Sequence, residues 1–185
     1  MKRNSLMGAM LVVVLVTIVF TPVLSIAAMK VFVDIQGIPG ESQDSLHKDW
    51  VEAVGYGDSI LMPFSIGGGG GGAGKPEFAP IKIIKLLDKA SVDLRYYLAT
   101  GRHIPNVKIE FWTAGEDAKI IYKIELQDVL IGEVSTTWAN GSDRPQELVA
   151  FYFLKIKWTY TPYKPDGTPL PGITHEYDLE RNTGA

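Results

Sequence analysis

The sequence predicts a mainly β fold, a closed antiparallel barrel or a sandwich, with one flanking α-helix. Apolar and polar residues alternate with a period of two in several short segments, and a single segment has the spacing of a helix. Turn-forming residues separate these segments at short intervals. Many short strands with one helix are typical of barrels and sandwiches, and closure into a barrel removes the free strand edges that favour aggregation.

The expected strands follow one another after the first 28 residues. In the first strand, Val31, Val33 and Ile35 share one face. Residues 148–154 are continuously apolar, which is typical of a strand covered on both faces, whereas residues 155–160 alternate. That strand therefore passes from a buried into a half-exposed environment. The predicted strands are 30–35, 50–56, 80–87, 107–112, 120–126, 129–138, 148–160 and 173–179.

One helix is expected to begin at Ser91, a residue type that favours the N-cap position. Apolar residues then recur with helical spacing at Leu94, Tyr97 and Leu98. Gly101 is placed to end the helix in a left-handed conformation.

The N-terminus has the pattern of a secretory signal peptide over residues 1–28. Lys2 and Arg3 precede an apolar centre of about 15 residues, and Ser25 and Ala27 supply the small residues that a signal peptidase recognises. A membrane-spanning helix needs roughly 20 apolar residues, so the centre is short for one. An uncleaved anchor, or a start codon at Met29, remains as an alternative. Residues 29–185 are expected to form one domain.

Composition excludes several classes of function. The chain is 46% apolar and 21% charged with a net charge of −3, which becomes −5 when the two positive charges of the leader are removed. A nucleic-acid partner is not expected, because backbone phosphates require a basic face. Cysteine is absent, which excludes disulfides and thiolate metal sites. No membrane contact is expected after leader removal.

A glycine-rich segment resembles a nucleotide-binding motif only in part. Gly69 to Lys75 has the G-x-x-x-x-G-K spacing, but Pro76 replaces the Ser or Thr that binds magnesium, and a strand pattern follows. No cofactor is therefore expected. The six consecutive glycines at 67–72 have a high ordering cost and are expected to be mobile in an isolated subunit.

No residue pattern indicates catalysis. No G-x-S-x-G motif is present, and the histidines lack metal-binding spacing. They are interpreted as surface residues, and they are His47, His103 and His175. We therefore expect neither an enzyme nor a metal site.

Three aromatic residues near the end of the chain have two interpretations. Trp158, Tyr160 and Tyr163 are of the type that can form a sugar-binding platform. Packing in the core or between subunits is favoured.

Several motifs resemble the Hcp family, the haemolysin-coregulated tube proteins of bacterial type VI secretion. The resemblance starts at GIPGES (37–42) and HKDW (47–50) and continues at LDKAS (87–91). It then extends through further segments, at 120–122, 126–129, 147–160 and 166–167. It covers essentially the whole chain after residue 28.

This resemblance implies a β-barrel with one flanking helix that assembles into homo-hexameric rings. In the family, rings stack into a tube that a contractile sheath propels from the cell, with sheath and spike proteins as partners and effectors as cargo. The loop after the first strand would then lie at ring contacts. Its candidate interface residues are Glu41, Ser42, Asp44, His47, Lys48, Asp49 and Trp50.

A cleaved leader would place the chain in the periplasm or outside the cell by the general export route. Family tubes instead assemble in the cytoplasm before secretion, which is the expected location if Met29 is the true start. The alternative function is a secreted Hcp-like module that binds a small molecule or glycan and takes no part in a contractile machine.

Overall fold

The structure is a computed structural model that describes residues 29–63, 74–115 and 117–184. The expected leader over 1–28 and the glycine run over 67–72 lie outside the described residues. Within the described part of the chain, no helix has the length and apolar character needed to span a membrane.

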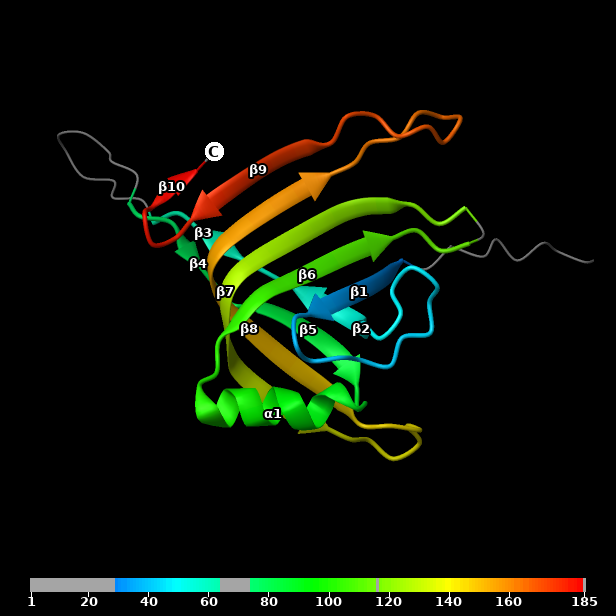
Figure 1. The fold of residues 1–185 in the computed structure, drawn as a ribbon, viewed down its shortest axis with the longest axis vertical. Helices are drawn as coiled ribbons and strands as arrows, with labels where there is room; N and C mark the ends of the chain where they lie inside the picture. The colour runs from blue at the N-terminus through cyan, green and yellow to red at the C-terminus, as the bar shows by residue number, and fades with distance from the viewer. Residues whose placement is uncertain (1–28, 64–73, 116, 185) are drawn as a thin grey trace, which may run out of the picture.

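The described chain folds into ten strands and one helix (Figure 1). The strands are β1 (Lys30–Ile35), β2 (Val51–Gly57), β3 (Ile60–Leu61), β4 (Glu77–Phe78), β5 (Ile81–Leu86), β6 (Ile104–Trp112), β7 (Ile120–Thr137), β8 (Gln146–Tyr160), β9 (Ile173–Asp178) and β10 (Thr183–Gly184). The helix is α1 (Ala90–Thr100), which lies between β5 and β6 in the sequence.

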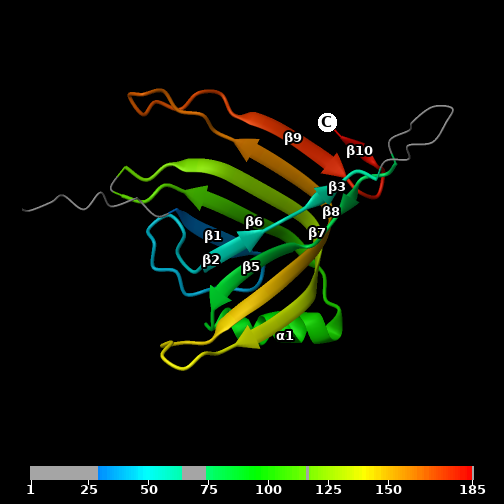
Figure 2. The ribbon, with the colours of Figure 1, turned by 180° about the vertical axis from the view of Figure 1, so that it is seen from behind.

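Six antiparallel strands close into a barrel, which confirms the predicted fold class. Their order is β8-β5-β2-β1-β6-β7, and pairing of β7 with β8 completes the closure. The long strand β8 pairs with β5 along its first half and with β9 along its second half, so that β9 and β10 extend the sheet beyond the barrel (Figures 1 and 2). β3 and β4 form a separate small sheet.

The strand register brings the predicted apolar faces together inside the barrel. Ile35 pairs with Val107, which pairs with Leu126, and Leu126 pairs with Ile156. All four side chains are buried and belong to one core cluster. Burial of apolar area is the main favourable term in folding, so the period-two pattern explains why these strands pair in this register.

Strand β8 differs from the sequence-based expectation. Val149, Phe151 and Phe153 point into the core, but Tyr152 is 54% exposed and Leu154 is 39% exposed on the opposite face. The prediction that this segment is covered on both faces is therefore wrong within a single chain. Strand β7 also differs, because the two strands predicted there are one continuous strand.

Helix α1 lies across one end of the barrel (Figure 1). Ser91 is not its N-cap as predicted, because it lies inside the first turn, and the Asp88 carboxylate instead accepts the backbone N–H of Ala90 at 2.9 Å. The predicted end is confirmed, since Gly101 has φ +62° and its N–H bonds to the last turn. Leu94 faces the core.

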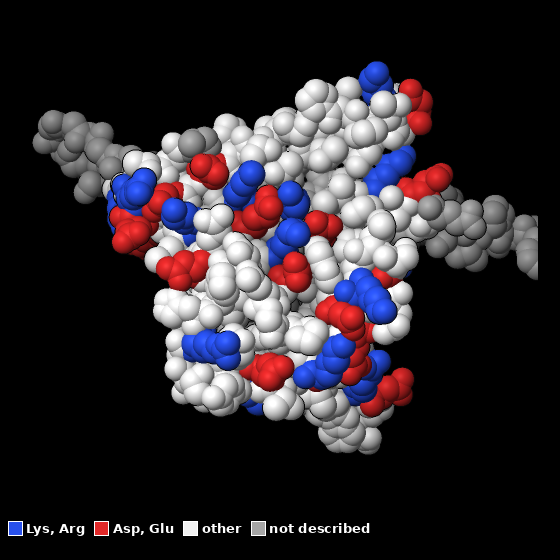
Figure 3. All heavy atoms as spheres, in the orientation of Figure 1, with Lys and Arg blue, Asp and Glu red and all other residues white. Residues whose placement is uncertain are grey.

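The outer face of β1, β6, β7, β8 and β9 carries charges of alternating sign, and this surface is called the charged face below (Figure 3). In register across the five strands, these charges are Asp34, Lys108, Glu125, Lys157 and Glu176. Directly opposed residues of opposite sign stabilise neighbouring strands. The same face bounds a cleft of about 920 Å³ that extends to Arg181 and Thr183.

Candidate subunit-contact surface

The loop between β1 and β2 is held in one conformation by its own backbone. The Gly40 N–H bonds to the Asp49 carbonyl at 2.7 Å, and Ser42 exchanges backbone bonds with Trp50 and Asp49 at 3.0 Å each. A Cβ at Gly40 would lie 2.3 Å from the Trp50 carbonyl oxygen, so only glycine fits there without rearrangement. A long polar loop is usually a mobile element, but this one is closed and rigid.

His47 anchors the loop from inside. Its ring is stacked on Phe32 with centroids 4.0 Å apart, and its nitrogens lie 2.8 Å from Asp44 Oδ1 and 3.2 Å from Glu110 Oε2. Only 2% of His47 is exposed, so its prediction as a surface histidine is wrong. The aromatic rings of Trp50 and other neighbours supply the contacts that sequence spacing did not reveal.

The seven predicted interface residues divide into three groups by exposure. Two are buried, two are half-buried and three are exposed: Ser42 and His47, then Asp44 and Trp50, then Glu41, Lys48 and Asp49. The buried hydroxyl of Ser42 donates to Glu52 at 2.7 Å, a contact within the chain. The exposed group is therefore available to a partner, and the buried group shapes the loop.

Lys89 connects this loop to the start of α1. Its backbone N–H donates to the Glu41 carboxylate at 3.0 Å, and its ammonium group lies 2.8 Å from Asp49. Val92 and Tyr96 follow on the exposed side of the helix, one turn apart. We call this combination the loop–helix surface, and it comprises the exposed side chains of Glu41, Lys48, Asp49, Val92 and Tyr96.

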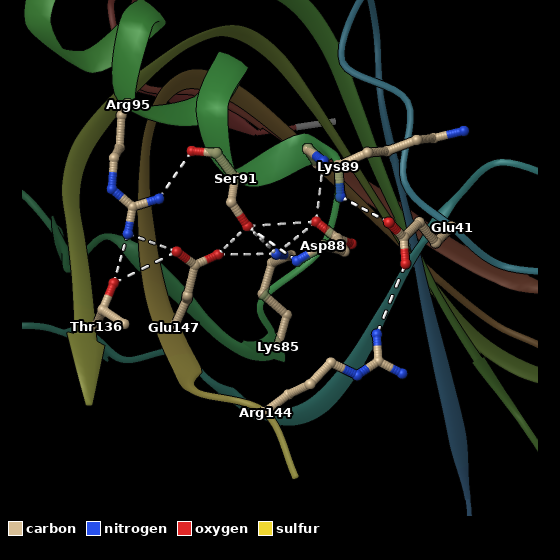
Figure 4. A network of polar contacts seen from close by, with 10 residues as sticks. Glu41, Lys85, Asp88, Lys89, Ser91, Arg95, Thr136, Arg144 and Glu147 are labelled. Carbon is tan, nitrogen blue, oxygen red and sulfur yellow. Dashed lines mark hydrogen bonds and ion pairs between the residues drawn. The ribbon is translucent and has the colours of Figure 1, made fainter. Parts of the chain in front are cut away.

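A buried polar network supports the helix from below (Figure 4). Lys85 on β5 pairs in register with Glu147 on β8, and its Nζ lies 2.9 Å from Oε2 of that carboxylate. The Ser91 hydroxyl donates to the same oxygen, and Arg95 donates to the other oxygen at 2.5 Å. Glu147 therefore connects two strands and the first turns of α1.

The hydrogen bonds of this network change the pKa of the Glu147 carboxylate. Burial alone would raise the pKa of Glu147, but hydrogen bonds from Ser91, Lys85 and Arg95 outweigh it and lower the pKa below its ordinary value. In the loop, the hydrogen bond with His47 lowers the pKa of Asp44, and the bond from Lys89 lowers the pKa of Asp49.

The network was missed at the sequence level, although a signal was present. Ile81, Ile83 and Lys85 alternate onto the core face of β5, so the lysine stands where an apolar residue is expected. Glu147 occupies the equivalent position before Val149 on β8. Two opposite charges at core positions of different strands predict a buried pair, provided that the register is known.

Of the three aromatic residues near the C-terminus, Trp158 and Tyr163 pack within the chain as predicted, whereas Tyr160 is 50% exposed. Trp158 stacks on Phe78 with centroids 6.4 Å apart, and the Tyr163 hydroxyl donates to the Ile120 carbonyl at 2.8 Å. His103 and His175 are exposed, in agreement with the prediction. Among the described residues, no group of three or more His, Asp or Glu side chains is placed to hold a metal ion.

Comparison with known proteins places this barrel, with its end-covering helix and its loop held by contacts within the chain, among the structural components of bacterial secretion machinery. A family model described as type VI secretion system effector, Hcp, matches residues 32–160. Because this match covers more than half of the 185 residues, the chain belongs to the Hcp family.

Individual relatives agree with this assignment. Protein hcp1 of Pseudomonas aeruginosa is 30% identical over 161 residues, which cover 85% of this chain and 99% of that protein. A solved structure described as a type six secretion system protein superposes with a TM-score of 0.80 at 25% identity, covering 85% of this chain and 100% of the other. For Hcp1 from Salmonella typhimurium the TM-score is 0.72 at 26% identity, covering 85% and 99%.

Family membership confirms several predictions at once. The chain is a tube or effector protein of the type VI secretion system, and it is structural, not enzymatic. The family forms hexameric rings, and its members are secreted through the type VI system.

Proposed function

We propose that copies of this chain assemble into homo-hexameric rings through the loop–helix surface, and that the rings stack into a tube that carries effectors. The observation that carries this proposal is the rigid, charge-bearing loop fixed to a closed barrel in a chain of a ring-forming family. A loop that is already ordered loses little conformational entropy on docking, so its contact can set the orientation of a neighbour.

The exposed charges of the loop are suited to fixing the register of a neighbouring copy. Glu41 is held by Lys89 and lies 3.6 Å from Arg144, so it is already oriented before any partner arrives. Charged groups at the margin of an interface contribute specificity more than affinity. In this proposal Ser42 and His47 act indirectly, by keeping the loop in shape.

A ring imposes a further condition on the contact. A closed ring of six requires heterologous contacts, in which one surface of a copy meets a different surface of the next copy. The loop–helix surface is therefore one half of each contact. Sheath and spike proteins and small effectors are further partners of the assembled tube in this proposal.

Light scattering and electron microscopy test the proposal. The sample is the protein purified from cells that express the full-length chain. Six-fold annular particles with the mass of a hexamer are the expected result. Charge reversal at Glu41 and Asp49 should raise the concentration needed for assembly by at least tenfold. Particles that stay monomeric at high concentration would contradict ring formation.

The alternative function, a secreted module for a small molecule or glycan, draws support from the cleft beside the charged face. A cleft of about 920 Å³ is within the size range of small-molecule sites. A monomer with saturable binding, weakened by changing Lys155 or Arg181, would favour this alternative over the ring.

The export route depends on residues 1–28. We propose that residues 29–185 are the functional unit and that the chain reaches the outside of the cell or the periplasm. Mass spectrometry of the secreted form tests the leader: a first residue near Met29 supports cleavage or a later start. A retained leader on secreted protein would contradict both.

A further inference from the structure

The loop that joins β7 and β8 carries an asparagine followed by a glycine, Asn140 and Gly141. Strand pairing ends at Thr137 and Gln146, and the loop projects from the end of the barrel at which α1 lies (Figures 1 and 2, yellow). Residues 138–144 are all exposed. In such a turn the backbone nitrogen of the glycine can approach the asparagine side chain, because glycine has no Cβ to obstruct it.

The turn around Asn140 leaves both groups of this pair accessible. The Ser142 N–H donates to the Ala139 carbonyl at 3.2 Å and closes the turn. Neither the Asn140 side-chain amide nor the Gly141 N–H forms a hydrogen bond with another residue in the part of the chain that the structure describes. Gly141 has φ +95°, and a Cβ added there would meet nothing within 4 Å. The space around the pair is therefore open.

A comparable pair elsewhere in the chain is protected. Gly167 follows Asp166, but its N–H donates to the Lys164 carbonyl at 2.8 Å. The Asp166 carboxylate accepts the Thr168 N–H at 2.9 Å, and this bond lowers the pKa of Asp166. The carboxyl group therefore stays ionised at neutral pH, and an ionised carboxylate resists attack by a nitrogen nucleophile.

The other two asparagines after the leader are also protected. The Asn106 side chain lies on β6 and donates to Gln36 at 2.8 Å. The Asn182 side chain accepts the Tyr177 hydroxyl at 2.8 Å. Each of these asparagines is followed by a β-branched residue, which crowds the backbone nitrogen. The loop between β7 and β8 thus differs from these sites in both contacts and neighbours.

We propose that Asn140 is a modification site, at which spontaneous deamidation forms aspartate and isoaspartate. The Gly141 nitrogen gives its proton to solvent base and forms a bond to Cγ of Asn140. The bond from Cγ to the side-chain nitrogen breaks, and ammonia leaves with a proton taken from water. Water then opens the cyclic imide at either of its carbonyl groups. The net reaction consumes one water and releases one ammonia, with no oxidant or reductant.

The reaction changes the charge of the loop with time. Each event adds one negative charge, and the isoaspartate product also adds one methylene carbon to the main chain. The new carboxylate lies close in sequence to Arg144, whose guanidinium is 3.6 Å from Glu41 of the loop–helix surface. This inference does not depend on ring formation, because the reaction needs only water and the residues of one loop.

Peptide mapping by mass spectrometry tests the proposal on the full-length protein after incubation at neutral and at mildly alkaline pH. Asn140 should convert at least tenfold faster than Asn106 or Asn182 in the same sample. Isoaspartate should be among the products, and the rate should rise with pH, because the attacking nitrogen must lose a proton. A synthetic peptide of residues 137–146 is the positive control. Conversion of the peptide with an intact Asn140 in the protein would overturn the proposal, as would equal rates at all three asparagines.

Two variants separate this reaction from other modifications. Asn140→Gln should reduce the acidic form seen on isoelectric focusing at least tenfold, because the longer side chain closes a larger ring less readily. An unchanged amount of that form would place the reaction elsewhere and overturn the proposal. The residues around Gly141 also match the acceptor pattern for N-linked glycosylation. Ser142→Ala removes that pattern and should leave the rate of deamidation unchanged, whereas a glycan on Asn140 of the unchanged chain would overturn the proposal, since it occupies the same amide.

Discussion

Lys85 and Glu147 face each other across β5 and β8, with 2.9 Å between Nζ and Oε2 and both side chains fully buried. Removing two charges from water is costly, and their attraction offsets this cost only when further hydrogen bonds satisfy both groups. Asp88, Ser91 and Arg95 supply those bonds. The pair therefore holds α1 against the barrel at one defined position.

Removing one partner of this pair should destabilise the fold strongly. Glu147→Gln removes one of the two negative charges that contact the buried Lys85 ammonium. We expect a loss of roughly 3 kcal/mol in the free energy of unfolding. Urea unfolding followed by circular dichroism measures it. The matched control near the surface is Lys155→Met, which breaks a partly exposed pair with Asp178 and should cost less than about 1 kcal/mol. Equal losses for both variants would contradict the role assigned to burial.

The same carboxylate predicts a dependence of stability on pH. The pKa of Glu147 is lower in the folded chain than in the unfolded chain, so the unfolded chain binds more protons between the two values. Its contribution to stability is complete above the unfolded pKa of about 4.3 and is lost as the pH falls through the folded pKa. Unfolding free energies measured from pH 7 to pH 3 should fall less steeply for Glu147→Gln than for the unchanged chain. Parallel curves would disprove this contribution.

His47 should control the order of the loop more than the stability of the barrel. His47→Gln removes the ring that stacks on Phe32 and lies between Asp44 and Glu110. Hydrogen exchange of the amides in residues 41–50 should become at least tenfold faster. His103→Gln is the control, because His103 is exposed and pairs only with Asp128 at the surface. Unchanged exchange in the His47 variant would show that the backbone bonds suffice to hold the loop.

Sequence reasoning predicted the fold more fully than the contacts within the candidate site. Alternation identified β1 and β6, and Gly101 marked the end of the helix, because these signals depend on neighbouring residues only. The burial of His47 depends on Phe32 and Glu110, residues that come together only after the strands pair. The spacing of residue types along the sequence does not reveal such contacts.

The errors also have physical causes. Ser91 is a residue type that favours the N-cap position, but the helix begins earlier, with Lys89 as its N-cap. The Ser91 hydroxyl instead bonds to Glu147, and the Asp88 carboxylate accepts the Ala90 N–H. The apolar run in β8 predicted two covered faces, but Tyr152 and Leu154 are exposed, because only the face with Val149, Phe151 and Phe153 turns into the core.

Gly40 provides the most direct test of whether loop shape governs assembly. In Gly40→Ala the new Cβ would meet the Trp50 carbonyl oxygen at 2.3 Å, and backbone atoms on both sides of the loop must move to relieve the clash. Overpacking of this kind costs about 3 kcal/mol, and here it should also displace Glu41 from the Lys89 amide. Gly57→Ala is the matched control, since a Cβ there meets nothing within 4 Å. Light scattering should show hexamers for the Gly57 variant and mainly monomers for the Gly40 variant at the same concentration. If the Gly40 variant remains folded and forms hexamers as readily as the control, the shape of this loop does not determine the ring, and the contact must depend on other surfaces.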